Sequence, residues 1–255
     1  RSPALVTRTI CARVRAQIEE PGEVLLPGKL FAEIARKLPE GMVSLAMNEK
    51  YVTTIRCGTS RSTLTGFATK DFPLSLDLIN THALHVPQKR LREMIGRVTF
   101  AIAVQESRQT LTGCLMEVTK NELRLVGLDG FRLALQKMHG DFILPDGVSI
   151  LKAIIPGHVV GEMSRIMVDD PEAMLTFHMD GAHLMAVIGD TTLITSLLAG
   201  EYINYKQILP DAWQTRVTVK RAELCDAIER ASLMAREGKN NLIRMSAGND
   251  VMRIT

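Results

Sequence analysis

Residues 26–38 read LPGKLFAEIARKL and residues 155–167 read IPGHVVGEMSRIM, two segments that align at an offset of 129 residues. Four aligned positions are identical: Pro27 and Pro156, Gly28 and Gly157, Glu33 and Glu162, and Arg36 and Arg165. In the first copy a proline precedes an apolar stripe formed by Leu30, Ile34 and Leu38, as at the start of a helix. The pair therefore predicts two copies of one amphipathic helix.

A second helical segment also occurs twice. LREMIGRVTF at residues 91–100 matches LCDAIERASL at residues 224–233 at an offset of 133 residues. Because two independent segments give nearly the same period, we infer a repeating unit of about 130 residues. The two kinds of helix alternate along the chain, and their predicted ranges are 27–38, 87–100, 156–167 and 220–237.

Between the helices, apolar and polar residues alternate with a period of two, which is typical of antiparallel strands with one buried face. Asn48-Glu49-Lys50 and Asp180-Gly181 interrupt such alternations as short hairpin turns. The predicted strands are 42–47, 51–57, 115–118, 123–126, 132–137, 174–179, 184–188, 192–197 and 252–255. The fold class is therefore predicted to be α+β, with tandem repeats of a domain made of helices and antiparallel sheet.

The order of these helix-plus-strand halves predicts one whole domain and two partial ones. Residues 81–213 hold a complete pair of halves. Residues 1–80 hold the end of a preceding domain, and residues 214–255 hold the beginning of a following one. We therefore expect the chain to be part of a longer protein with three repeats.

The composition favours a folded protein of the cytoplasm. Apolar residues make up 46% of the 255 residues, and the sequence contains neither a signal peptide nor an 18-residue apolar run. No CxxC pair occurs, so the four cysteines are predicted to be buried free thiols: Cys11, Cys57, Cys114 and Cys225.

Signatures of enzymes and metal sites are absent from the sequence. Residues 22–29 have the glycines and lysine of a phosphate loop, but the spacing is one residue too long and Leu30 stands where Ser or Thr would bind magnesium. The histidines near the strands are predicted on the surface, His82 and His85 in a loop and His178 and His183 in a hairpin. We therefore expect no catalytic residue, no metal and no cofactor.

The net charge of +3 is unevenly distributed. The four predicted helices together carry +5, and the remaining residues carry −2. From charge alone, an ordinary solvated helix face is the favoured explanation of this excess. The alternative is a helix-lined surface that contacts phosphates without reading bases.

Four motifs, in order along the chain, resemble the beta subunit of bacterial DNA polymerase III, the sliding clamp family: LPGKLFAEIARKLPEG, RQTLTGCLMEV, LVGLDGFRLAL and ERASLMAREGKNN. The resemblance covers nearly the whole chain. It implies three similar domains per subunit and a head-to-tail homodimeric ring around double-stranded DNA, with helices inside and sheets outside. It also implies a processivity factor that tethers the replicative polymerase and has no catalytic activity of its own.

In this family the helix-lined hole meets DNA without sequence readout. The resemblance implies these candidates for DNA contact: Lys29, Arg36, Arg92, Arg97, Gln105, His158, Arg165 and Arg230. His158 stands where the family often has lysine, and its neighbour is Gly157. The helix over 156–167 is therefore expected to contribute little to DNA binding.

A groove between domains two and three is the second site that the resemblance implies. It would bind short apolar peptide motifs of the DNA polymerase III alpha subunit, the clamp loader and repair proteins. The matching residues are Leu111, Leu128, Gly130, Phe131, Arg132, Leu133, Ile203, Gln207 and Ile208. Phe131, Ile203 and Gln207 depart from the family pattern and make the rim more apolar. Without the resemblance, the residues alone favour a hydrophobic core behind a hairpin over a peptide-binding groove.

An alternative function remains open from the residues. An unrelated α+β repeat protein could act as a protein-interaction scaffold that does not encircle DNA. In that case the basic helices would be merely solvated, and the protein would not remain trapped on circular DNA.

Overall fold

The computed structural model describes residues 8–71, 78, 81–105, 108–235, 242–248 and 250–255. The chain divides into two compact units, Arg1–Ile203 and Asn204–Thr255, and each is described by itself. Among the described residues, no helix is long and apolar enough to cross a membrane.

The first helix is followed by a three-stranded antiparallel sheet. Helix α1 (Gly28–Lys37) precedes β2 (Val43–Met47), β3 (Val52–Cys57) and β4 (Ser60–Thr65), which pair in the order β2-β3-β4. A short 3-10 helix, η1 (Thr69–Asp71), follows. This is the predicted arrangement of one helix and about three strands.

The central part of the chain contains the same arrangement twice. Its first half consists of β5 (Ala83–Pro87), α2 (Gln88–Gly96), η2 (Thr99–Ala101), η3 (Gln109–Thr112), β6 (Gly113–Thr119), β7 (Glu122–Leu128) and β8 (Leu133–His139). Its second half consists of β9 (Leu151–Pro156), α3 (Gly157–Ile166), β10 (Met174–Met179), β11 (His183–Ile188) and β12 (Thr191–Ser196). The tandem α+β organisation expected from the repeat is therefore present.

The strand that precedes each helix joins the two halves. Strand β5 pairs with β10, and β9 pairs with β6, so each half supplies one strand to the sheet of the other. The resulting sheets have the orders β1-β12-β11-β10-β5 and β8-β7-β6-β9, where β1 is Arg8–Ala12. Each of β5 and β9 ends at a proline, Pro87 or Pro156, and a helix begins at the next residue. Proline suits this junction because it has no backbone N–H to donate. The N–H groups at the start of a helix have no partner within the helix, so nothing is lost there.

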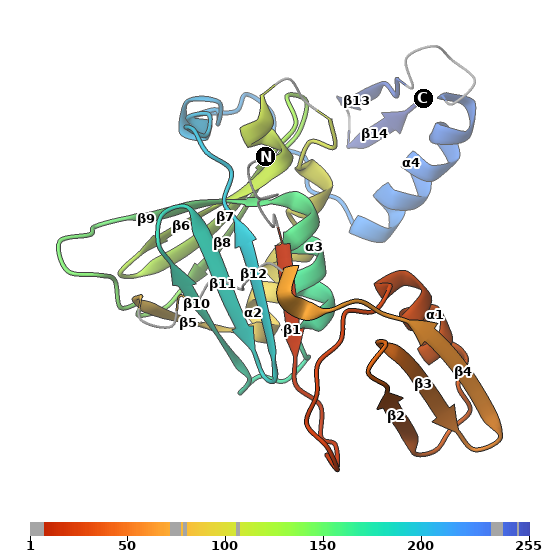
Figure 1. Ribbon diagram of the computed structural model, residues 1–255. Coiled ribbons are helices and arrows are strands. Elements are labelled where there is room, and N and C mark those ends of the chain that lie inside the picture. Colours follow the sequence, from red (N-terminus) through yellow and green to blue (C-terminus); the bar gives the residue numbers. More distant parts are fainter. Residues whose placement is uncertain (1–7, 72–77, 79–80, 106–107, 236–241, 249) are drawn as a thin grey trace. The chain divides into compact units, whose positions relative to one another are not determined.

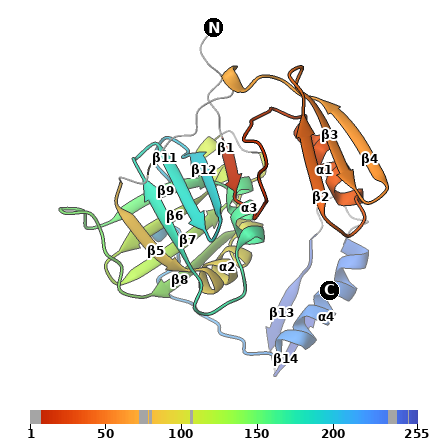
Figure 2. The same cartoon turned by 60° about the horizontal axis from the view of Figure 1, so that its bottom comes forward.

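One hydrophobic core fills the space between the two sheets and the helices. Strand residues such as Phe177 and Leu123 are fully buried in it together with Leu91 of α2 and Met163 of α3. Helices α2 and α3 contact each other and lie side by side (Figures 1 and 2). Their apolar faces meet the core, so their remaining faces are left for solvent or a ligand.

The second unit begins with η4 (Tyr205–Gln207) and continues through α4 (Arg221–Ala235) to the hairpin β13 (Met245–Gly248) and β14 (Val251–Ile254). The backbone of Arg244 exchanges two hydrogen bonds with Thr255, which extends the hairpin pairing by one step. Helix α4 contacts β14. The helix predicted over 220–237 is present, although residues 236 and 237 lie outside the described residues.

The prediction of one continuous helix over 87–100 is wrong. Helix α2 ends at Gly96, and the N–H groups of Arg97 and Val98 bind the carbonyl groups of Met94 and Ile95 in a tighter turn. This turn brings the Val98 carbonyl against β7, where a Cβ atom at Gly127 would lie only 2.8 Å from it. Close packing of η2 on the sheet thus replaces the last helical turn.

Two predictions about burial are also wrong in part. Cys57 and Cys114 are buried as expected, but Cys11 and Cys225 are exposed. Among the histidines, His85 lies within β5 rather than in a loop, and His178 is buried with its Nδ1 atom 3.2 Å from the carbonyl oxygen of Thr81. His178 follows the core residue Phe177 on β10, so its side chain lies on the opposite face of the sheet, where it is buried beside Thr81 instead of exposed at the hairpin end.

Candidate nucleic-acid and peptide interface

The predicted DNA-contacting residues of the central part lie on the helix faces that point away from the core. On α2, Leu91, Met94 and Ile95 are buried, while Arg92 and the C-cap residue Arg97 are exposed. The helical repeat of 3.6 residues per turn explains this separation, because residues one turn apart share a face.

Helix α3 repeats this arrangement with less positive charge. Val159, Val160 and Met163 are buried, and His158 and Arg165 are exposed. Since α2 and α3 contact each other, the structure brings together four of the predicted residues on one helix pair: Arg92, Arg97, His158 and Arg165. This helix pair is called the basic helix face below.

Ion pairs within each helix moderate the charge of the basic helix face. Arg165 Nη1 lies 2.7 Å from Glu162 Oε1, and Arg97 Nη2 lies 3.9 Å from Glu93 Oε2. Within the described part of the chain, Arg92 forms no ion pair. Arg92 is therefore the cation of this face that is most available to a phosphate.

The other predicted DNA-contacting residues are exposed but lie elsewhere. Lys29 and Arg36 are on α1, and Gln105 is in the segment after η2. Arg230 is on α4 in the second unit. All eight predicted residues are thus accessible to solvent.

Four of the predicted peptide-binding residues meet in a small apolar cluster. Leu111 and Leu128 are buried there with Ala103, and Leu133, Tyr202 and Ile203 pack against them while remaining half exposed. This set of six residues is called the apolar cluster below. The structure separates it from the main core of the central part.

Sequence reasoning missed Ala103 and Tyr202. The Tyr202 hydroxyl donates a hydrogen bond to the carbonyl oxygen of Val126 at 3.4 Å, and burial raises the pKa of that hydroxyl. Tyr202 could have been found from its position beside Ile203, because tyrosine often places an apolar ring in a contact and its hydroxyl on a backbone acceptor. Gln207 and Ile208 lie in the second unit, the former in η4 and the latter exposed just after it.

The turn between β7 and β8 holds the remaining predicted residues of this site. Gly130 has a φ angle of +85°, which favours glycine, and Phe131 at the tip is 99% exposed. Arg132 is exposed and donates hydrogen bonds from Nε and Nη2 to Asp129 Oδ2, at 2.9 and 2.6 Å. These hydrogen bonds hold the pKa of Asp129 below its ordinary value, so its carboxylate is charged at neutral pH.

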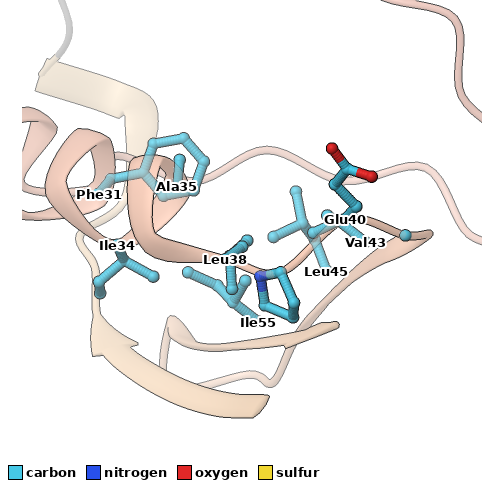
Figure 3. A pocket seen from close by; sticks show the side chains of 10 residues that line it. Phe31, Ile34, Ala35, Leu38, Glu40, Val43, Leu45 and Ile55 are labelled. Atoms are coloured by element: carbon cyan, nitrogen blue, oxygen red, sulfur yellow. The ribbon is translucent and has the colours of Figure 1, made fainter. Parts of the chain in front are cut away.

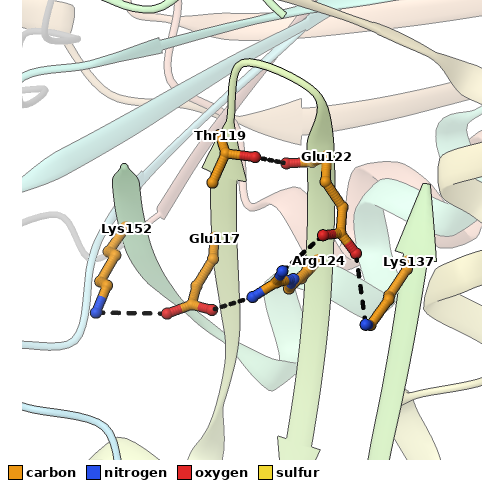
Figure 4. Close-up of polar contacts among 6 residues, drawn as sticks. All are labelled: Glu117, Thr119, Glu122, Arg124, Lys137 and Lys152. Carbon is orange, nitrogen blue, oxygen red and sulfur yellow. Dashed lines mark hydrogen bonds and ion pairs between the residues drawn. The ribbon is translucent and has the colours of Figure 1, made fainter. Parts of the chain in front are cut away.

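A row of alternating charges crosses the four-stranded sheet of the central part (Figure 4). Glu117 lies 3.4 Å from Lys152 and 3.9 Å from Arg124, and Glu122 lies 2.6 Å from Arg124 and 3.7 Å from Lys137. Lys152, Glu117, Arg124 and Lys137 are cross-strand neighbours on β9, β6, β7 and β8, and Glu122 lies two residues before Arg124 on β7. The two lysines at the ends of this row form ion pairs with glutamates of the same sheet. The basic helix face is therefore the more favourable surface for an anion.

A pocket of about 340 Å³ lies between α1 and the sheet that follows it (Figure 3). Its lining is mostly apolar and includes Phe31, Ile34, Leu38, Val43 and Ile55. None of the residues predicted to contact DNA or peptide lines this pocket. It is therefore a separate feature of the first helix and its sheet.

Comparisons with known proteins agree over nearly the whole chain. Residues 8–77, 85–204 and 206–255 match the family models of the N-terminal, central and C-terminal domains of the DNA polymerase III beta subunit. The beta sliding clamp of Staphylococcus aureus is 33% identical over 250 residues, which is 98% of this chain and 65% of that protein. The beta sliding clamp of Staphylococcus epidermidis is 34% identical over 239 residues, or 94% of this chain and 62% of that protein. The chain thus spans less than two thirds of the length of these relatives.

Solved structures of clamps have the same fold. The sliding clamp of Bacillus subtilis superposes with a TM-score of 0.87 at 28% identity, covering 97% of this chain and 67% of that one. The DNA polymerase III subunit beta of Pseudomonas aeruginosa superposes with a TM-score of 0.86 at 26% identity, covering 97% and 67%. A Pseudomonas aeruginosa clamp solved with griselimycin bound gives a TM-score of 0.87 at 26% identity, covering 98% and 66%.

Proposed function

Because the chain belongs to the DNA polymerase III beta subunit family, we propose that it acts in a sliding clamp that encircles double-stranded DNA and confers processivity on a polymerase. The observation that carries this proposal is the succession of three clamp-domain matches, in order, over nearly the whole chain. We further propose that the chain consists of the later part of domain one (1–80), all of domain two (81–213) and the beginning of domain three (214–255).

The basic helix face supports contact with DNA. A sliding surface must attract phosphates without holding one register, which favours long, solvated cations over buried ones. Arg92 and Arg97 have this character, and the ion pair between Arg165 and Glu162 weakens the attraction at the neighbouring helix. In the proposed head-to-tail homodimeric ring, these helices line the hole and the sheets form the outside. Closure of the sheets between subunits would also remove exposed strand edges.

The apolar cluster supports binding of partner peptides. Leu133 and Ile203 are half exposed beside buried leucines, which suits a short peptide with leucine or phenylalanine anchors. We propose that such peptides come from the DNA polymerase III alpha subunit, the clamp loader and other proteins with clamp-binding motifs. The clamp itself would catalyse nothing and would work in the cytoplasm, where bacterial DNA is replicated.

Topological trapping tests the proposed function. Protein loaded onto nicked circular DNA is expected to stay bound through gel filtration at high salt and to be lost when the circle is linearised. A scaffold that does not encircle DNA would be retained equally on circular and linear DNA, and that result would rule out the clamp.

A further inference from the structure

One carboxylate organises the turn beside the apolar cluster. Asp129 Oδ1 accepts hydrogen bonds from the backbone N–H groups of Phe131 and Arg132, at 3.0 and 2.8 Å. Its second oxygen, Oδ2, accepts two hydrogen bonds from the Arg132 guanidinium. A single side chain thus closes the turn and neutralises the cation that the turn presents.

Arg132 is also held from a second side. Its guanidinium carbon lies 6.0 Å from the centroid of the Phe100 ring, within the range of a cation–π contact. The Arg132 side chain is 57% exposed, whereas that of Asp129 is only 12% exposed. The pair therefore lies at the solvent edge of the apolar cluster, between Leu128 and Leu133, and has no net charge.

We propose that Asp129 sets the ligand preference of the apolar cluster by occupying Arg132, so that neutral apolar peptides are preferred over acidic ones. This inference rests on the peptide-binding role proposed above. An acidic side chain of a ligand could reach only the guanidinium N–H groups that Asp129 leaves free, and it would then lie beside a second carboxylate. Like-charge contacts of this kind discriminate against a ligand even where its apolar anchors fit.

A second turn of the same design provides a matched control. Asp180 Oδ1 accepts hydrogen bonds from the N–H groups of Ala182 and His183, at 2.9 and 2.7 Å. Gly181 has a φ angle of +91°, and Asp180 Oδ2 lies 3.1 Å from His183 Nδ1. This turn joins β10 to β11 and contributes no residue to the apolar cluster. Asp180→Asn therefore removes the same charge from the same geometry at a different place.

The test compares two acetylated and amidated hexapeptides with the same leucine and phenylalanine anchors, one with two glutamines and one with two glutamates at the other positions. Binding to the wild-type chain and to Asp129→Asn is measured by fluorescence anisotropy. The asparagine oxygen can still accept both N–H groups, so the turn should be kept, and an unchanged melting temperature checks this. Asp129→Asn is expected to raise affinity for the acidic peptide about three- to fivefold and to leave the neutral peptide unaffected. Added salt should remove the gain.

Three results would overturn the inference while leaving peptide binding intact. They are an equal change for both peptides, a gain that survives in Asp129→Asn combined with Arg132→Gln, and the same gain in Asp180→Asn. Binding of neither peptide to the wild-type chain would instead contradict the proposed peptide-binding role, and this inference with it.

Discussion

At the residue scale, Leu133 connects the fold to the proposed peptide site. It is the first residue of β8 and pairs with Leu128 at the end of β7, where both belong to the apolar cluster. Leu128 is buried, but Leu133 is only half buried, so a ligand can reach its side chain without opening the core. A polar change at Leu133 should therefore affect binding more than folding.

Leu133→Asp is expected to weaken binding of a polymerase C-terminal peptide by about tenfold or more, because an unpaired carboxylate in an apolar contact costs ~1–3 kcal/mol. Titration calorimetry gives the affinity, and circular dichroism checks the fold. Ile143→Asp is the matched control, since Ile143 is exposed outside the apolar cluster. Equal affinity of Leu133→Asp and wild type would mean that the peptide binds elsewhere.

At the element scale, local sequence signals predicted the ends of three helices well and the end of α2 poorly. Apolar spacing and the prolines located α1, α3 and α4 to within about two residues at each end of the described helices. The same spacing continued past the end of α2, because Val98 and Ala101 are apolar for a different reason, namely burial against β7. The spacing of apolar residues in the sequence is the same for a further helical turn and for a 3-10 segment packed on a sheet, so it cannot tell the two apart.

Strands β5 and β9 show a second limit of the sequence. Each belongs by position to one half of the central domain but pairs with a strand of the other half. Such exchange depends on contacts between residues far apart in the chain, and period-two alternation carries no information about them. The repeat therefore predicted the number of halves correctly, whereas the way the halves join had to come from the structure.

The charged row on the sheet yields a prediction at this scale. Hydrogen bonding from Arg124 holds the pKa of Glu122 below its ordinary value of 4.5. A carboxylate with a lowered folded-state pKa contributes stability above its unfolded pKa and loses it as the pH falls through the folded pKa. Glu122→Gln should therefore lower the free energy of unfolding by ~0.5–1 kcal/mol at pH 7, and the difference from wild type should shrink below pH 4.5.

Urea unfolding at several pH values between 7 and 3 measures this difference. Glu201→Gln, at an exposed position without an ion pair among the described residues, is the control and should show no such dependence. A difference for Glu122→Gln that stays constant over the whole range would show that the carboxylate charge does not stabilise the sheet.

At the scale of the whole molecule, the distribution of charge matters more than its total. A net charge of +3 says little, but the excess on the helices falls on side chains such as Arg92 and Arg97 that are exposed on the basic helix face. Helical spacing made this exposure predictable from the sequence. The acidic residues that form ion pairs with the cations of the helices were less predictable. The pair of Glu162 with Arg165 follows from helical spacing, whereas Asp169 pairs at 3.0 Å with Lys89, which is far away in the sequence.

The last prediction concerns this face as a surface for DNA. Arg92→Glu combined with Arg97→Glu is expected to weaken DNA association and to lower the slope of log affinity against log salt by about one to two, because each lost phosphate contact releases about one counterion fewer. Lys120→Glu combined with Arg61→Glu makes the same change of charge at two exposed positions, one in the turn between β6 and β7 and one on β4. If net charge alone governs association, both pairs will change the slope equally. If the basic helix face contacts DNA, only the first pair will, and sedimentation should show the same oligomeric state for both.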